Sequence, residues 1–587
     1  MAPRAAVLPA FLLLGCFPPG EGLDPPRSKV YFPVGLAVDA DQRFLFVVNS
    51  DFDLQYNGGT VQSWDLEQVR ARVPRYCESD PDCVRDITPG VRDPRDTCSP
   101  EAKWCVRRDW PQPCYLFKEQ DSRERALYPG RCGYISQTVP QDGGTAILPL
   151  GGNEEVVPGR SVRIGAFATD VVIRSRPENV LGWTVTGDAP ERLFVPVRGD
   201  ATLHWLDVDN GMLECGQDGT DDGSCDGRHR AGDSPEEENT RNSGRLAPEP
   251  FGLDADENGL SVAVSNQISG TVSLFAHSRK VTTTGGVTTS AIAWDEGPKY
   301  MFAETGMPDR PIGIATVPVP LAMPNSGRER LPEFLVTFRN APVVFLLRVY
   351  DDAAAAPRRP YTQRYESERI ETNSSGIDSR GIAVDAVHRH AEENKCLTDF
   401  GVTRECALAP DFPGCEAAKD PLFQACLVPA SATALDVFLA NRAPSSLVFG
   451  RTQPIVSDSV TTDIPSFWSG IPLDVGPARV YTGDIINLAG ERERRIFVLC
   501  FDSRRIAIYD PESQVLETEI VTGRGPQAFA MDVATGSMNP NDDHAFAYVG
   551  HFLDSYVGVV DLDQRHGALY GAMIATIGKP EPPRASK

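Results

Sequence analysis

The chain has 587 residues, of which 41% are hydrophobic, 51 are glycine and 49 are proline. This length exceeds the roughly 100–200 residues of an ordinary single domain unless the chain is built from repeats, and the apolar content excludes a wholly disordered protein. The formal net charge of −24 opposes binding to phosphate backbones and so argues against a nucleic-acid partner, and the sequence has no run of about 18 apolar residues that would predict a membrane-spanning helix.

The first residues predict an export signal. Residues 1–4 carry a basic residue, and residues 5–14 are apolar, as in a cleaved signal peptide. The sequence Leu13-Leu14-Gly15-Cys16 resembles the bacterial lipobox. This resemblance implies cleavage before Cys16, acylation of its thiol and a lipid-anchored protein of the bacterial cell envelope, at the outer membrane and facing the periplasm or the exterior. An ordinary signal peptide with an incidental cysteine is the alternative. Residues 16–28 are rich in proline and predict a short, stiff tether.

Three segments share one pattern of short strands. They occupy residues 32–65, 250–275 and 525–561, and each has an apolar opening strand, a turn, a second apolar strand ending in a polar residue, and a third strand. Four looser copies open at Ile164-Gly165, Arg310, Arg380 and Gly476. β-branched and aromatic residues fill the runs, and Gly, Asn or Asp ends them, which is typical of strands. A fourth strand usually follows, most clearly at residues 518–522.

Seven such copies predict an all-β protein, a seven-bladed β-propeller over residues 29–580 followed by a tail at 581–587, because four-stranded units repeated around a ring form this fold. The copies begin farther apart than the roughly 40–50 residues of a plain blade. The excess falls mainly in residues 67–160, 207–245 and 386–432, which we therefore interpret as insertions.

The repeat pattern is Pro-x-Gly-[Ile/Leu]-Ala-Val, a turn, Leu-[Phe/Tyr]-Val-x-Asn, and then Thr-Val-x-x-x-Asp. It resembles the YVTN-type β-propeller repeat of bacterial surface and periplasmic proteins. The resemblance covers about half of the chain and implies the propeller fold. It does not select a function, because that family includes surface-layer proteins, lactonase-like enzymes and binding modules.

The cysteines form even clusters in polar segments, which in an exported chain predicts disulfides within each cluster. The cluster members are Cys77, Cys83, Cys98, Cys105, Cys114 and Cys132; Cys215 and Cys225; and Cys396, Cys406, Cys415 and Cys426. Pairing within the six-cysteine cluster stays open. Cys500 lies in an apolar strand and is predicted to be a buried, unreactive thiol. No pair has the C-x2-C spacing of zinc ribbons, and we predict no metal site and no cofactor.

A polar residue closes the second strand of every copy, and we expect these residues to meet near the central channel. They are Asn49, Arg198, Asn266, Arg339, Asn441, Asp502 and His551. One interpretation is a ligand-binding ring. The other is that the Asn and Asp side chains fold the following turn, which suits the three asparagines better than the arginines or the histidine. Two arginines favour a carboxylate or another anionic group.

Catalytic motifs are absent from the sequence: it has no G-x-S-x-G, H-E-x-x-H or P-loop. The segment from Asp254 to Gly259 matches half of a calcium loop, but Ser265 stands where a bidentate Glu is needed, so a turn is favoured. We therefore predict a non-catalytic, lipid-anchored propeller that binds a protein or polysaccharide at the envelope. The alternatives are a hydrolase or lactonase-like enzyme with its site in the channel, and a structural envelope component.

Overall fold

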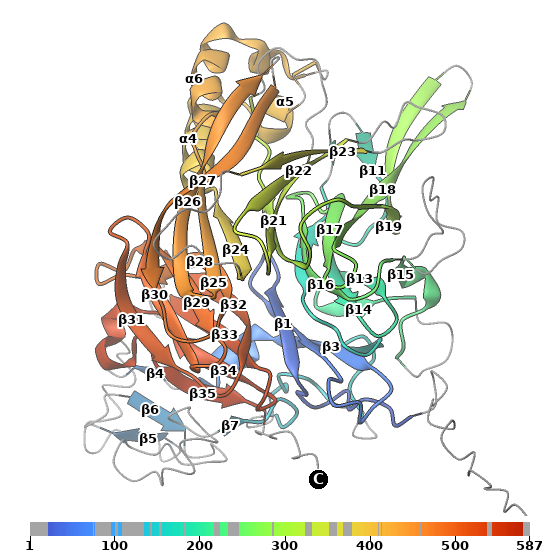
Figure 1. Ribbon diagram of the computed structural model, residues 1–587. Coiled ribbons are helices and arrows are strands. Elements are labelled where there is room, and N and C mark those ends of the chain that lie inside the picture. Colours follow the sequence, from blue (N-terminus) through green and yellow to red (C-terminus); the bar gives the residue numbers. More distant parts are fainter. Residues whose placement is uncertain are drawn as a thin grey trace, which may run out of the picture.

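The computed structural model (Figure 1) describes most of the chain. The described residues are 22–73, 75–76, 96–99, 104–107, 134–140, 144–151, 155–177, 179–180, 183–216, 223–232, 246–284, 287–322, 332–350, 361–367, 378–408, 410–411, 414–457, 460–536 and 543–578.

Seven sheets form the blades of a β-propeller, as the repeats predicted. Blade 1 consists of β1 (Pro33–Val38), β2 (Phe44–Asn49), β3 (Gly59–Asp65) and β8 (Ser161–Ile164). Blade 2 consists of β9 (Val172–Ser175), β12 (Glu191–Val197), β13 (Thr202–Asp209) and β14 (Met212–Glu214), and β15 (Arg230–Ala231) pairs with β13. Blade 3 consists of β16 (Pro250–Ala255), β17 (Ser261–Asn266), β18 (Thr271–Thr284) and β19 (Val287–Glu304), extended by β11 (Trp183–Val185) and β10 (Asn179–Val180).

The remaining four blades follow in chain order. Blade 4 has β20 (Pro311–Val317), β21 (Glu333–Phe338), β22 (Val344–Tyr350) and β23 (Tyr361–Glu366). Blade 5 has β24 (Ser379–Asp385), β25 (Asp436–Arg442), β26 (Ser445–Ser457) and β27 (Val460–Pro472). Blade 6 has β28 (Pro477–Ile486), β29 (Arg492–Cys500), β30 (Arg505–Asp510) and β31 (Val515–Val521). Blade 7 has β32 (Pro526–Ala534), β33 (His544–His551), β34 (Tyr556–Asp561), β35 (Met573–Ile577) and the parallel strand β7 (Tyr134–Ile135).

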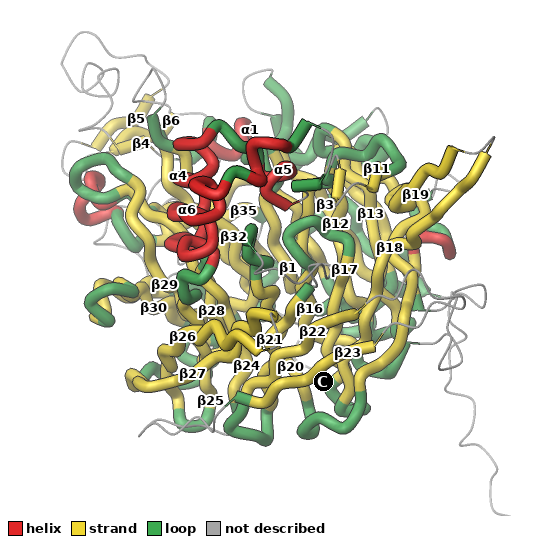
Figure 2. Tube along the Cα trace, turned by 90° about the horizontal axis from the view of Figure 1, so that it is seen from above, coloured by secondary structure: helices red, strands yellow, loops and turns green. Residues whose placement is uncertain are grey.

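The first strand of each blade lies innermost, and Figure 2 shows β1, β16, β28 and β32 gathered around one centre. The inner strand β32 contacts β1, so the last blade packs against the first and the ring closes. The core lies between the blades. On β2, Leu45 and Val47 pack toward blade 7, whereas Phe46 and Val48 pack toward blade 2. Successive strand residues face opposite sides, so a strand buried on both faces reads as a continuous apolar run.

The glycine of the Pro-x-Gly motif allows neighbouring inner strands to approach closely. A Cβ atom added to Gly252 of β16 would lie 2.1 Å from the carbonyl oxygen of Ile312 on β20. One added to Gly381 of β24 would lie 2.8 Å from the Cα of Arg479 on β28. Glycine therefore permits close packing of the inner strand in blades 3 and 5, whereas blades 2, 6 and 7 carry Asp170, Arg479 and Ala528 at the matching position.

One repeat boundary differs from the prediction. Ile164, which was expected to open the second copy, is the last residue of β8, the outer strand of blade 1. The inner strand of blade 2 begins at Val172. This blade lacks the Pro-x-Gly signal, because Asp170 stands where blades 1, 3, 4 and 5 carry glycine and Ala168 stands where most blades carry proline, so the boundary could not be read from the motif.

The long segments between strands hold further elements. A small sheet of β4 (Arg75–Tyr76), β6 (Trp104–Arg107) and β5 (Asp96–Ser99), and the helix α1 (Leu66–Arg70), follow β3. The short 3-10 helices are η1 (Gly227–His229), η2 (Glu416–Lys419) and η4 (Gln564–Leu569). Between β24 and β25 lie α4 (Val387–Phe400), α5 (Arg404–Leu408) and α6 (Pro421–Ser431). Among the described residues, no helix combines the length and the apolar character that a membrane span requires.

The helical insertion has its own core and packs on the long β26–β27 hairpin (Figure 1). Phe423 and Leu427 of α6 are fully buried in this core. Arg389 of α4 joins Asp463 of β27, with 2.8 Å between Nη2 and Oδ1 and both side chains buried. An apolar core and a buried ion pair together fix the insertion to blade 5.

Three disulfides lie within the predicted clusters. They join Cys215 to Cys225, Cys396 to Cys426, and Cys406 to Cys415. The cluster of Cys77, Cys83, Cys98, Cys105, Cys114 and Cys132 lies outside the residues whose side chains are described, so its pairing stays a prediction, as does the acylation of Cys16. Cys500 is a buried free thiol, and burial raises its pKa to about 12.

Candidate functional site

Seven equivalent backbone hydrogen bonds define one end of the channel. In each blade, a residue at the end of the second strand donates its N–H to a carbonyl just before the start of the inner strand, at 2.8–3.1 Å. The donor directly follows the second strand, except in blade 5, where it is the last residue of that strand. We call the seven donor residues the mouth ring: Ser50, Arg198, Gln267, Arg339, Arg442, Phe501 and Phe552. Six of the seven acceptors have positive φ angles, namely Phe32, Phe167, Glu249, Arg310, Gly476 and Gly525. The same local turn thus places seven side chains around one opening.

A second ring comes from the inner strands. In six blades the register of the first two strands shifts around the second residue of the Pro-x-Gly segment, as in a β-bulge. An extra residue in one strand re-aims its side chain. We call the residues at this position, with Thr169 in blade 2, the bulge ring: Val34, Thr169, Phe251, Ile312, Arg380, Ala478 and Gln527.

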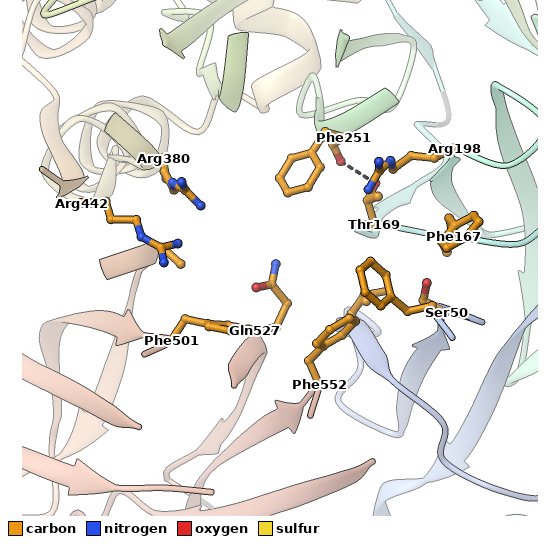
Figure 3. A pocket seen from close by; sticks show the side chains of 14 residues that line it. Ser50, Phe167, Thr169, Arg198, Phe251, Arg380, Arg442, Phe501, Gln527 and Phe552 are labelled. Atoms are coloured by element: carbon orange, nitrogen blue, oxygen red, sulfur yellow. Dashed lines mark hydrogen bonds between the residues drawn. The ribbon is translucent and has the colours of Figure 1, made fainter. Parts of the chain in front are cut away.

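The two rings enclose a cavity of about 320 Å³, which we call the mouth pocket. Five members of the mouth ring and six of the bulge ring line it, together with Phe52, Phe167 and Ala168. Figure 3 shows Arg380 and Arg442 side by side on one wall, Phe552 on another, and Gln527 between them. Six of the seven blades contribute to one small site, so the site requires the closed ring.

The arginines of this end are each paired with an acid from the neighbouring segment. Arg442 Nη2 lies 2.6 Å from Asp502 Oδ2, and Arg380 Nη2 lies 3.0 Å from Asp378 Oδ2. Arg198 pairs with Glu249. Each guanidinium carries five N–H donors, and the side chains of Arg198 and Arg442 are 28% and 31% exposed. Donors therefore remain for a ligand.

Positive charge accumulates beside Arg339. Burial lowers the pKa of Arg339, and the charges of Arg380, Arg310 and Arg442 lower that pKa further, against the opposing effect of Asp378. The Nε of Arg339 lies 3.5 Å from Asp378 Oδ1. Four arginines thus act on one another here although the whole chain is strongly acidic, which makes this end of the channel distinct.

Aromatic side chains form the other wall of the pocket. The ring centroids of Phe52 and Phe552 are 5.1 Å apart, those of Phe52 and Phe167 are 5.9 Å apart, and those of Phe501 and Phe552 are 6.3 Å apart. Phe52 is 50% exposed. We call Phe52, Phe167, Phe501 and Phe552 the aromatic wall, and it gives the pocket an apolar side.

An ion pair crosses the ring immediately beyond the pocket. Arg479 of β28 in blade 6 approaches Asp170, which precedes β9 in blade 2, with 2.6 Å between Nη1 and Oδ2. Blades 1 and 7 stand between these two blades, so the pair, which we call the channel bridge, spans the channel. Its side chains are only 15% and 14% exposed. The residues before them, Ala478 and Thr169, line the pocket.

The three predicted asparagines do not line the mouth pocket. Asn49, Asn266 and Asn441 are buried at the ends of their strands. Asn49 accepts the N–H of Tyr31 at 3.0 Å, and Asn266 donates to the carbonyl of Ala247 at 2.8 Å. Asn441 accepts from the hydroxyl of Ser379. Their amides thus hydrogen-bond residues at or just before the first strand of the same blade, and not the turn that follows the second strand.

The other predicted residues divide between two roles. Arg198 lines the mouth pocket, Arg339 belongs to the mouth ring but lies outside the pocket lining, and Asp502 is the partner of Arg442. His551 is fully buried and stacks on Tyr556 at 4.3 Å. Burial lowers the pKa of His551 to about 3.

Arg380, Arg442 and the aromatic wall were not predicted. The first residue of the inner strand pairs with an equivalent residue of the second strand in each of three blades: Pro33 with Asn49, Ser379 with Asn441, and Pro526 with His551. These pairs show that Asn49, Asn441 and His551 occupy the same position of the repeat. The side chains that reach the opening come one residue later. Alignment of the Asn positions alone would have found this offset, since Arg442 follows Asn441 and Phe552 follows His551.

The described residues contain no group of three or more His, Cys, Asp or Glu side chains that could hold a metal ion. The calcium-like segment is a turn: Asp256 accepts the N–H groups of Leu260 and Ser261, at 2.7 and 3.1 Å. Asp254 instead pairs with Arg174 at 2.6 Å.

No family model and no curated protein matches the chain. Solved structures resemble it only distantly. A candidate 6-phosphogluconolactonase from Bacteroides fragilis has a TM-score of 0.36 and 10% identity over 84% of this chain and 86% of that one. A Lactobacillus plantarum protein has a TM-score of 0.37 and 10% identity over 85% and 87%. Hydrazine synthase of Kuenenia stuttgartiensis has a TM-score of 0.37 and 9% identity over 93% and 100%. Similarity of this kind says nothing about a reaction or ligand.

Proposed function

We propose that this chain is a lipid-anchored binding protein of the bacterial cell envelope, and that its mouth pocket recognises an anionic group on a protein or polysaccharide partner. One observation carries the proposal: three arginines from two blades, Arg198 of blade 2 and Arg380 and Arg442 of blade 5, meet aromatic rings around a single cavity. The strands hold these side chains in place before a ligand arrives, so binding requires little ordering of the protein.

Binding rather than catalysis suits the chemistry of this pocket. Its fourteen lining residues include no carboxylate, histidine, lysine, tyrosine or cysteine, so the lining itself offers no general acid or base. The hydroxyl of Ser50 has no such group beside it in the lining. The nearby His551 is buried beneath the surface, and its pKa of about 3 makes it a weak base.

Photocrosslinking tests the binding site. A benzophenone side chain at position 52, on the pocket, is compared with one at Trp468 on β27; both native side chains are 50% exposed. In envelope preparations we expect a discrete adduct from position 52, reduced by Arg442→Met, and none from position 468. Equal labelling from both positions, or an adduct insensitive to Arg442→Met, would contradict the proposed site.

Membrane fractionation tests the anchor. Cys16→Ala should move the protein from the membrane to the soluble fraction, because the variant cannot carry the acyl chains that would hold a bacterial lipoprotein in the membrane. An unchanged distribution of the variant would refute acylation at Cys16.

A further inference from the structure

We infer that the mouth pocket takes one compact group in which a carboxylate is attached to a flat apolar body. This inference rests on the proposed function and narrows it: the pocket would select the apolar acid over the more hydrophilic acids that the same arginines could also attract. Two sources share this chemistry, namely a free aromatic carboxylate and the C-terminal residue of a protein partner.

The carboxylate is assigned to the wall of Arg380 and Arg442. Asp378 accepts hydrogen bonds from Nε and Nη2 of Arg380, and Asp502 accepts one from Nη2 of Arg442. The other N–H donors of both guanidinium groups are therefore available. A planar carboxylate matches this donor geometry and can accept two N–H bonds at once. It would also offset the repulsion among the arginines, which together with the larger effect of burial lowers the pKa of Arg339.

The apolar body is assigned to the aromatic wall. Phe52 keeps half of its surface exposed although it stands against Phe167 and Phe552. A flat apolar group laid on these rings would remove this surface from water and could pack edge to face with them.

The polar groups of the pocket are too few for a sugar. Apart from the arginines, they are Ser50, Thr169 and Gln527. The hydroxyl of Thr169 already donates to the carbonyl of Phe251 at 2.7 Å (Figure 3). A uronic acid would bring several hydroxyl groups against phenylalanine rings, where they would lose hydrogen bonds to water without replacement.

The size and depth of the pocket set the length of the ligand. A volume of about 320 Å³ lies at the small end of ligand sites. Beyond it, the Arg479–Asp170 channel bridge crosses the path. A chain therefore meets the bridge instead of passing through the propeller, which favours a small molecule or the end of a polymer.

Titration calorimetry of the full chain carrying Cys16→Ala tests the inference with defined probes. They are 3-phenylpropanoate, its neutral amide, glucuronate, and N-acetylphenylalanine. We expect 3-phenylpropanoate or N-acetylphenylalanine to bind at least tenfold more tightly than the amide and than glucuronate. Tighter binding of N-acetylphenylalanine identifies a polypeptide C-terminus as the source, and tighter binding of 3-phenylpropanoate identifies a free acid.

Two variants locate the contacts. Arg442→Met should weaken binding of the preferred acid at least tenfold, and so should Phe552→Ala. Arg451→Met is the matched control, because this arginine pairs with Asp436 on the same blade but lies outside the pocket lining. Equal affinity for acid and amide, preference for glucuronate, or loss of binding in the control alone would overturn the inference. A crosslinked partner from position 52 would leave the proposed function standing in each of those cases.

Discussion

The two ends of the propeller use the same kinds of residue differently. At the end opposite the mouth, Asp532 accepts from Arg70 and His544, each at 2.8 Å, and from Tyr548 at 3.1 Å, and it has no exposed surface. At the mouth, Asp502 faces Arg442, and both side chains remain about one-third exposed. The first arrangement satisfies its carboxylate from several elements, whereas the second leaves donors for a ligand.

This difference shows why charge alone does not mark a site. Arg494 also bridges Asp385 and Asp484, at 2.6 and 3.1 Å, and so ties blade 5 to blade 6. Such pairs hold the ring together because breaking a buried pair leaves the remaining charge buried without a partner. A binding site requires charged groups that are held in place but keep hydrogen-bond donors available for a ligand.

The largest expected effect is at the end opposite the mouth. Asp532→Ala should lower the free energy of unfolding by about 3 kcal/mol, because it leaves the partly buried Arg70 without its carboxylate. Asp436→Ala, which breaks a pair whose arginine is 54% exposed, should cost at most about 1 kcal/mol. Urea unfolding measures both, and similar losses would erase the distinction between the two ends.

The channel bridge should give a smaller effect. Asp170→Ala or Arg479→Ala should each cost about 2–3 kcal/mol, because each leaves a charged partner with little exposure. The double variant should cost less than the sum of the two, with a coupling of at least about 1 kcal/mol. A double-mutant cycle in chemical unfolding checks this, and additive losses would show that the two side chains act independently.

His551 should make stability depend on pH. Its folded pKa of about 3 lies below the ordinary histidine pKa of about 6.5, so the unfolded chain takes up a proton first as the pH falls. The stability that the neutral histidine contributes is therefore fully present above about pH 6.5 and is lost as the pH falls toward 3. His551→Asn, which restores the residue found at the matching position of blades 1, 3 and 5, should remove this component. An unaltered pH profile of unfolding would argue against a buried neutral histidine.

The smallest stability effect is expected at the mouth. Arg380→Met combined with Arg442→Met should change the free energy of unfolding by less than about 1 kcal/mol, because both ion pairs are partly solvated. The same variant should weaken binding of an aromatic carboxylate at least tenfold. A large drop in the melting temperature together with intact binding would instead assign the arginines to the framework.

The repeats predicted much of the fold because local patterns carry it. Apolar runs such as residues 44–48 predicted strands, whereas the proposed insertion 207–245 begins inside β13 and includes β14, the outer strand of blade 2. The helices α4 and α6 were not predicted. They form against a core of their own and against β27, so their stability comes from contacts that the strand pattern does not report.

By itself, the sequence determined the number of blades, the inner strands with close-packing glycine, and two of the three cysteine clusters with their local pairing. Only the tertiary structure decided which side chains face the channel. A strand alternates its faces, so an offset of one residue moves a side chain from the core to the opening: Asn441 is buried, whereas Arg442 lines the pocket. The Arg479–Asp170 bridge joins residues 309 positions apart, and no local pattern could pair them before the ring closes.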